Sequence, residues 1–452
     1  MIGERMTRGS MVTLLVLVVL ASLAGALLAA SSGSVVPLLI PAAVLAVPVL
    51  GRRVLSDPVW VLCLFLLVVV NLDFFKVGAT GLTLDVLLSS ALLWALLVRG
   101  LLGDQPVRLD AVQKLFLFFL AVTFLSCLIG VAPVQSIKRW GRDLQYAVFL
   151  IFLLSVPLGP RKTKWIVGAV IASSLIPCLL GLAALFVDLP ALYGQPTPVG
   201  GGREVDRLTV TLSHPVTLAL YLGVTATLTL GCLLDGRWFR RIWLCPVLAL
   251  QLLILFRTYG RTGWAAFLVA LVALLWLRGH RRMLLAGLPA ALVWLYFAVP
   301  SFTGRWSMAL EGGQENSMLW RLGLWNHALG LFPDRPLFGS GPGTFIDYVA
   351  YGKGFSAHQT WVGLLIETGV LGTVAFLVLQ IAVGRALWRR HREEGPRGSP
   401  LPGVMLAVWW GFFAASFTAY VYSLPAVMVY FWTMVALALR RPAGTGAAGE
   451  PG

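Results

Sequence analysis

Residues 352–372 read GKGFSAHQTWVGLLIETGVLG and mark a sharp change in the character of the chain. They close a polar segment of roughly sixty residues and enter a long apolar run at Thr360. Apolar runs of about 18 or more residues are typical of membrane-spanning helices. His358 is therefore expected where an extramembrane segment meets a membrane.

Similar apolar runs recur along the whole chain. It is 58% hydrophobic and 12% charged over 452 residues, whereas a soluble domain is about 45–50% apolar and about 25% charged. These runs predict an all-α fold, a polytopic transmembrane helical bundle of about 12–14 spans. The predicted spans are 11–30, 34–50, 58–74, 82–99, 111–131, 144–159, 163–187, 209–234, 241–257, 262–278, 283–300, 360–387, 403–421 and 424–440.

The spans divide the chain into four parts. Residues 1–300 hold transmembrane helices with short loops, 301–359 form one large periplasmic segment, 360–440 hold the C-terminal transmembrane helices, and 441–452 are a disordered tail. The first apolar run is long for a signal peptide, so we expect it to be retained.

The large outer segment contains two recognisable patterns. Residues 316–331 have the spacing of an amphipathic helix. The glycine cluster in Gly339–Phe345 lacks the lysine of a nucleotide-binding loop, and we interpret it as backbone turns over a cavity.

The formal net charge of +16 would suggest nucleic acid as a partner in a soluble protein. Here the basic residues are scattered among short loops, which is typical of membrane orientation and of contact with anionic lipid head groups. Every second loop is basic, so the pattern places both termini in the cytoplasm and predicts no nucleic-acid partner.

Outer loops are expected to be poor in lysine and arginine, yet three predicted outer loops are basic. Basic residues on that side of the membrane suggest an anionic ligand. They could instead pair with lipid head groups or with nearby carboxylates. The loops are 135–143 with Lys138, Arg139 and Arg142, 188–208 with Arg203 and Arg207, and 257–261 with Arg257 and Arg261.

His358 and these arginines suit one kind of chemistry. Arginine binds phosphate oxygens with two parallel hydrogen bonds, and histidine can take a proton from a hydroxyl nucleophile. Together they suit the displacement of a lipid pyrophosphate, although an edge histidine can also simply bond a loop carbonyl. His214 lies two helical turns after Arg207 if that segment is helical, which makes it a second candidate.

Several other chemistries find no support in the sequence. There is no Asp-x-Asp motif, no HExxH motif and no GxSxG motif. The five cysteines have no CxxC spacing. We therefore expect no metal site, no cofactor and no disulfide.

Four segments resemble, in order, the motifs of the O-antigen ligase and O-antigen polymerase superfamily. His358–Gly372 resembles its HNxxLxxxxExGxxG signature, and Arg321–Trp325 with Pro336–Phe345 is similar to its RxxxW…PxxGxGxGxF segment. Arg207–Pro215 and Tyr259–Gly263 resemble two further motifs upstream. Three positions depart from the family pattern: Gln359 replaces the usual Asn, Tyr259 a common Ser and Val210 a frequent Gly.

The resemblance implies a metal-independent, inverting glycosyltransferase of the GT-C type in the bacterial inner membrane. It would take glycan from undecaprenyl pyrophosphate at the periplasmic face and, as a ligase, transfer it to a sugar hydroxyl of lipid A–core. The alternative is an O-antigen or exopolysaccharide polymerase, whose acceptor is a second lipid-linked glycan. Related enzymes transfer oligosaccharides to proteins. A transporter or flippase is a different class, which would need ionisable residues at mid-membrane.

The resemblance also implies roles for individual residues. His358 would be the base on the acceptor hydroxyl, and Arg207 and Arg261 would bind the pyrophosphate. Arg142 and Arg321 are weaker assignments, from topology and from motif position respectively. Glu367 is expected to bond a neighbouring helix.

Overall fold

The computed structural model describes residues 58–72, 76–77, 82–83, 109–155, 158–194, 197–200, 203–212, 214–285, 317–351, 356–395 and 398–440. Predicted spans 11–30, 34–50, 82–99 and 283–300 lie wholly or mostly outside these residues, as do the retained first helix and the tail 441–452.

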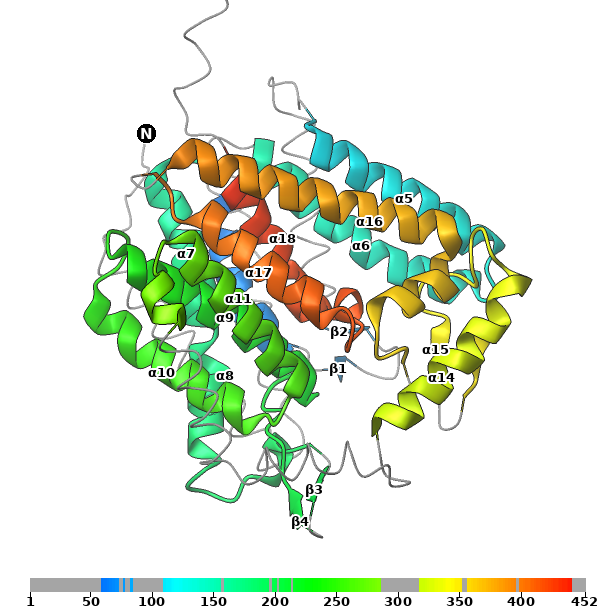
Figure 1. Ribbon diagram of the computed structural model, residues 1–452, viewed down its shortest axis with the longest axis horizontal. Coiled ribbons are helices and arrows are strands. Elements are labelled where there is room, and N and C mark those ends of the chain that lie inside the picture. Colours follow the sequence, from blue (N-terminus) through cyan, green and yellow to red (C-terminus); the bar gives the residue numbers. More distant parts are fainter. Residues whose placement is uncertain are drawn as a thin grey trace, which may run out of the picture.

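The described chain is a bundle of helices with two short antiparallel hairpins (Figure 1). The elements are α3 (Pro58–Leu72), β1 (Lys76–Val77), β2 (Leu82–Thr83), α5 (Ala111–Ile129), α6 (Pro133–Ser155), α7 (Pro160–Ser173), α8 (Leu175–Ala183), η2 (Pro190–Leu192), β3 (Thr197–Gly200), β4 (Arg203–Val205), α9 (Pro215–Asp235), α10 (Arg241–Arg257), α11 (Arg261–Leu277), α14 (Ser317–Leu331), η3 (Phe332–Asp334), α15 (Phe345–Val349), α16 (Thr360–Glu394), α17 (Leu401–Ala415), η4 (Val421–Ser423) and α18 (Pro425–Leu439).

Length and composition confirm the predicted fold class, a helical membrane bundle. Within the described part, α5, the α7–α8 stretch, α9 and α16 are long and apolar enough to cross a membrane. Helices α11, α17 and α18 are shorter and also apolar. Helices α9 and α18 are apolar on all sides and buried along most of their length, as expected for the centre of such a bundle.

Helix α16 is interrupted at Gly369. The residue has φ 65° and ψ −169°, a conformation that is essentially confined to glycine. A Cβ atom at this position would lie 2.3 Å from the carbonyl carbon and oxygen of Leu337. The interruption therefore depends on glycine for two reasons, the backbone conformation and the closeness of another chain segment.

Residues 336–341 form the segment that fills this interruption. The amides of Val370 and Leu371 donate to the carbonyls of Pro336 and Leu337, at 2.9 and 3.2 Å. Two further hydrogen bonds have the opposite direction. The amide of Ser340 donates to the carbonyl of Ile366 at 2.9 Å, and the amide of Gly341 donates to the carbonyl of Glu367 at 2.8 Å. The backbone groups freed by the break are thus satisfied by protein, as a membrane environment requires.

The glycine cluster makes this close approach possible. Gly339, Gly341 and Gly343 all have positive φ, and a Cβ on Gly339 would lie 2.5 Å from the carbonyl carbon of Glu367. The predicted turns are present. They pack on the interrupted helix, and a cavity beneath them stays a prediction.

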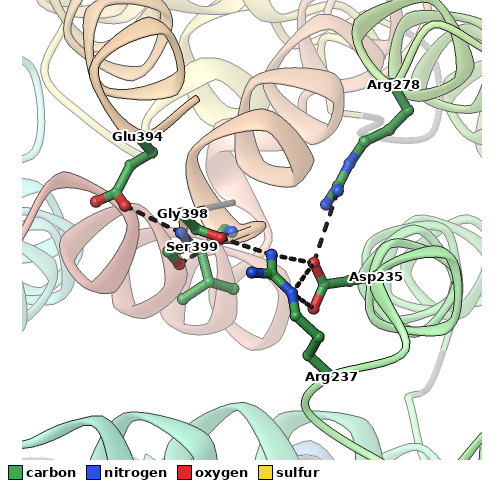
Figure 2. A network of polar contacts seen from close by, with 7 residues as sticks. Asp235, Arg237, Arg278, Glu394, Gly398 and Ser399 are labelled. Atoms are coloured by element: carbon green, nitrogen blue, oxygen red, sulfur yellow. Dashed lines mark hydrogen bonds and ion pairs between the residues drawn. The ribbon is translucent and has the colours of Figure 1, made fainter. Parts of the chain in front are cut away.

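The C-terminal ends of α9, α11 and α16 meet at one end of the bundle, which we call the basic end (Figure 2). Asp235 forms ion pairs there with Arg237 at 2.6 Å and Arg278 at 3.8 Å. Arg237 also donates to the carbonyl of Gly398, at 2.7 Å. Helix α16 has 35 residues, roughly 50 Å at 1.5 Å per residue, so its first turn and the preceding His358 lie at the opposite end.

The prediction that residues 135–143 form an outer loop is wrong, because they belong to α6. Pro133 is the first residue of this helix, a position where proline is favoured. Ser136, Asp143 and Tyr146 are buried on one side of it. This polar stretch is helical because one face packs inside the protein.

Other predicted boundaries also move. The predicted span 163–187 is divided at Ser174 into α7 and α8. The predicted span 209–234 begins as a helix only at Pro215. The predicted span 403–421 ends as a helix at Ala415, whereas span 241–257 coincides with α10.

The interruption in α16 can be tested with a matched pair of substitutions. Gly395 has nearly the same backbone conformation as Gly369, φ 61° and ψ −167°, but a Cβ there would meet nothing within 4 Å. We expect Gly395→Ala to cost about 1–3 kcal/mol from backbone strain alone. Gly369→Ala should lower the thermal unfolding midpoint of the purified protein much further, because it adds a steric clash. Equal losses would contradict this account.

Candidate active site

The segment that follows β4 lays Arg207 against the turn between α10 and α11. The Nε of Arg207 donates a hydrogen bond to the carbonyl of Thr258 at 3.0 Å, across 51 residues of sequence. The amide of Leu208 lies 3.5 Å from the carbonyl of Arg257. Two of the arginine-bearing loops predicted separately are therefore in contact.

The α10–α11 turn places Arg261 at the start of α11. The hydroxyl of Thr258 accepts a hydrogen bond from the amide of Gly260, at 3.1 Å. Gly263 lets α11 approach α9, since a Cβ there would lie 2.3 Å from the Cβ of Ala219. A cation at a helix N-terminus is unfavourable by itself, whereas the helix terminus and a guanidinium both attract anions. The start of α11 is therefore suited to an anionic group.

His214 is the N-cap of α9. Its Nδ1 accepts a hydrogen bond from the amide of Val216 at 3.2 Å, which leaves Nε2 to carry the proton in the neutral ring. The prediction that Arg207 and His214 share a helical face is wrong. Pro215 disfavours helix in the residue before it, and Val210 has φ 53°. Val210 stands at the position where a glycine is frequent in the family, and this positive φ explains the preference.

His358 is held in an uncommon backbone conformation, φ 49°. On one side of it, the carbonyl of Ala357 accepts a hydrogen bond from Nε1 of Trp325 at 2.8 Å. On the other side, the side chain of Gln359 caps α16 by accepting from the amide of Val362. Gln359, which replaces the usual asparagine, thus acts here as a helix cap.

The connection between α17 and α18, residues 416–424, joins the elements around His358. The hydroxyl of Thr360 donates to the carbonyl of Ala419 at 2.9 Å. Arg321 on α14 lies 3.5 Å from the carbonyl of Thr418, and the hydroxyl of Thr418 lies 3.1 Å from that of Thr262 on α11. This connection therefore fixes α14, α16 and α11 relative to one another.

The surroundings of His358 favour its neutral form. Burial, with smaller contributions from the charges of Arg321 and His214, lowers the pKa of His358 to about 4. The indole of Trp320 lies edge-on to the imidazole, with ring centroids 6.0 Å apart. At neutral pH His358 is therefore unprotonated and can accept a proton.

The same electrostatic influences link the other candidates. His214 is exposed on one side, but desolvation by the protein on its other side lowers its pKa. The charges of Arg207 and Arg321 lower the pKa of His214 further. Burial lowers the pKa of Arg321, with a further contribution from Arg261. Arginine stays charged despite such shifts. A chain of pairwise electrostatic interactions thus links five predicted residues: Arg207, His214, Arg261, Arg321 and His358.

The sixth predicted residue, Arg142, lies on α6 within electrostatic range of Asp143 and Tyr146. Its neighbour Arg139 is buried and structural. Arg139 forms an ion pair with Asp143 at 3.5 Å and donates to the carbonyl of Tyr422 at 2.8 Å. The role of Arg142 stays a prediction.

Sequence reasoning missed three residues that frame the site. Trp320 immediately precedes a predicted site residue, so its position beside Arg321 was an available signal. Thr262 likewise follows Arg261. Thr418 fell inside the predicted span 403–421, where an apolar pattern concealed a helix end and a polar connection.

Glu367 and His327, two polar residues in or near the motif segments, have structural roles. Glu367 accepts a hydrogen bond from the hydroxyl of Tyr420 at 2.6 Å and another from the amide of Phe345 at 3.2 Å, so it bonds neighbouring elements as expected. His327 lies 3.2 Å from the carbonyl of Val349. Within the described ranges, no three His, Cys, Asp or Glu side chains gather as metal ligands.

Comparison with known proteins agrees with this picture. The model of the family described as O-Antigen ligase matches residues 246–377. The match confirms the resemblance to the O-antigen ligase and polymerase superfamily, whose members are membrane enzymes that transfer glycans. It spans Arg261, Arg321 and His358, while Arg207 and His214 lie just upstream. No curated protein matched the chain.

The low pKa of His358 can be measured by NMR on protein labelled at histidine Cε1, with His358→Gln to assign the resonance. We expect Arg321→Gln to raise the pKa of His358 from about 4, because removal of a nearby positive charge favours the protonated ring. The control is Arg335→Gln, whose guanidinium bonds the carbonyl of Ile129. The explanation fails if both variants leave the titration unchanged.

Proposed function

We propose that this chain, whose residues 246–377 match the O-antigen ligase family, is an inverting, metal-independent glycosyltransferase that uses a lipid-linked glycan. The donor is glycan on undecaprenyl pyrophosphate, and the acceptor is a sugar hydroxyl of lipid A–core. The reaction takes place at the periplasmic face of the bacterial inner membrane, at the end of the bundle opposite the basic end.

One observation carries the proposal: a neutral histidine lies within electrostatic range of Arg321, one of a group of arginines that are linked through His214 and Arg321. The group surrounds the start of α11, where a helix terminus adds its own preference for anions. A pyrophosphate carries several negative charges on oxygens that match the arginine fork. A hydroxyl acceptor needs a base that is unprotonated when it arrives, and His358 meets this need.

His358 and the arginines have separate roles in the proposed reaction. His358 accepts the proton of the acceptor hydroxyl while that oxygen forms a bond to the anomeric carbon. The bond from the anomeric carbon to the pyrophosphate oxygen breaks, and its electron pair leaves with the pyrophosphate. Arg207, Arg261 and Arg321 stabilise the charge that develops on this leaving group. Attack from the face opposite the leaving group inverts the anomeric configuration.

Binding of the donor also makes His358 a stronger base. The cationic neighbours that lower the pKa of His358 are the same groups that a pyrophosphate neutralises. With the donor bound, the pKa of His358 therefore rises toward its ordinary value. The histidine becomes a stronger base only when there is a leaving group to displace.

Substitution of His358 tests the assignment directly. We expect His358→Ala to reduce transfer about 10²–10⁴-fold, the range that a general base contributes. The assay is complementation of a ligase-deficient strain with a matched lipopolysaccharide core, followed on gels that resolve glycan length. Expression of each variant in the membrane is checked in parallel.

The control variant is His280→Ala, because His280 follows the end of α11 remote from Arg261. If the wild type caps the core with long glycan and His358→Ala leaves the glycan on undecaprenyl pyrophosphate, the ligase proposal stands. If the wild type lengthens lipid-linked glycan and leaves the core uncapped, the protein is a polymerase. Full activity of His358→Ala would refute the mechanism in either case.

The arginines can be tested separately from the base. We expect Arg261→Gln to lower kcat/KM about 10²-fold, a loss typical for one group that stabilises transition-state charge. Arg261→Lys should recover only part of the activity, because lysine keeps the charge and loses the planar fork. Arg240→Gln at the start of α10 is the charge-matched control. Comparable losses in Arg261→Gln and Arg240→Gln would point to net charge as the cause.

A further inference from the structure

A large pocket lies between α5, α6, α16 and α18, away from the candidate active site. Its volume is about 830 Å³. It includes the first residues of α5 and the last residues of α6 and α18, together with part of the last third of α16, so it belongs to the basic end. Six polar residues contribute to its wall: Asp110, Gln113, Arg385, Arg389, Arg390 and Arg440.

Two of these residues have a buried donor without a partner. Gln113 is 1% exposed and Arg390 is 8% exposed. The Oε1 of Gln113 accepts from the amide of Asp110 at 2.7 Å, but its Nε2 makes no hydrogen bond. Arg390 uses both terminal nitrogens and leaves Nε unbonded. Both donors are enclosed by protein, so the side chains that can reach a ligand in the pocket include the exposed Arg385 and Arg389.

The charges around the pocket favour an anion. Arg389 pairs with Glu393 at 3.7 Å, and Arg390 pairs with Glu393 and Glu394 at 2.9 and 2.6 Å. Asp110 is used in capping α5. Arg385 is exposed and forms no ion pair among the described residues, so its charge is available to a ligand.

The position of the pocket suggests the source of the anion. It opens among the ends of apolar helices, and the ends of membrane-spanning helices are where lipid head groups lie. Basic pockets between transmembrane helices at such a level bind anionic lipid head groups. Phosphate offers acceptor oxygens that match both an arginine fork and an amide donor.

We propose that this pocket binds a phosphate group, as presented by the head group of an anionic phospholipid. The proposal does not depend on the glycosyl-transfer reaction, because the pocket and the candidate active site lie at opposite ends of α16. It assigns Arg385 and Arg389 to the ligand, with Gln113 and Arg390 in the wall behind them.

The test is native mass spectrometry of the full-length protein in detergent, titrated with phosphatidylglycerol or with zwitterionic phosphatidylethanolamine. The variant is Arg385→Gln with Arg389→Gln, and Arg385→Gln alone is a milder second variant. Each arginine near a lipid surface contributes about five-fold in affinity, so the double variant should bind phosphatidylglycerol roughly 25-fold more weakly. Arg392→Gln is the control, because Arg392 is exposed on α16 and does not line the pocket.

A second measurement separates the two sources of phosphate. Thermal unfolding is followed with inorganic phosphate in place of lipid. Stabilisation by phosphatidylglycerol that the double variant loses assigns the site to a lipid head group. Stabilisation by inorganic phosphate that the double variant loses, with no preference between the lipids, assigns it to free phosphate. Equal binding by wild type, the double variant and Arg392→Gln overturns the proposal.

Discussion

The structure depends on the hydrogen bonds between the interrupted helix α16 and residues 336–341. A break in a helix frees amides and carbonyls that a membrane cannot satisfy. Here residues 336–341 supply both kinds of partner, to Val370 and Leu371 on one side and to Ile366 and Glu367 on the other. Helix α5 joins the same arrangement through Ser126, whose hydroxyl lies 2.5 Å from the carbonyl of Phe338 and 3.0 Å from that of Glu367. The position of His358 follows, since it precedes this helix by two residues.

The sequence was informative about the fold where apolar runs were long and uninterrupted. Helix α10 was predicted at its observed bounds for that reason. The approach failed where a polar stretch has one buried face, as in the first half of α6, because hydropathy alone does not show which side of a helix packs. It failed again at Thr418, where a single short polar connection follows an apolar run. Gly369 gave no local sign of an interruption, since the partner that fills the break is remote in sequence.

The candidate site was more predictable than the boundaries around it. Motif order and the excess of arginines in predicted outer loops together named Arg207, Arg261, Arg321 and His358, which the structure links through pairwise electrostatic interactions. The sequence did not show how these residues are positioned. Arg207 is held at the site by a hydrogen bond to the carbonyl of Thr258, and His214 is positioned as the N-cap of α9. The neutral state of His358 is also a property of the fold, because it arises from burial among residues that are distant along the chain.

The α17–α18 connection has a consequence for how the protein is made. Every candidate site residue is synthesised before Ser416, yet the carbonyls that hold Arg321 and Thr360 belong to residues 418 and 419. A nascent chain that has emerged only as far as α17 would possess the reacting groups without the framework that orients them. The site is thus completed by a segment that is synthesised after all of its reacting groups.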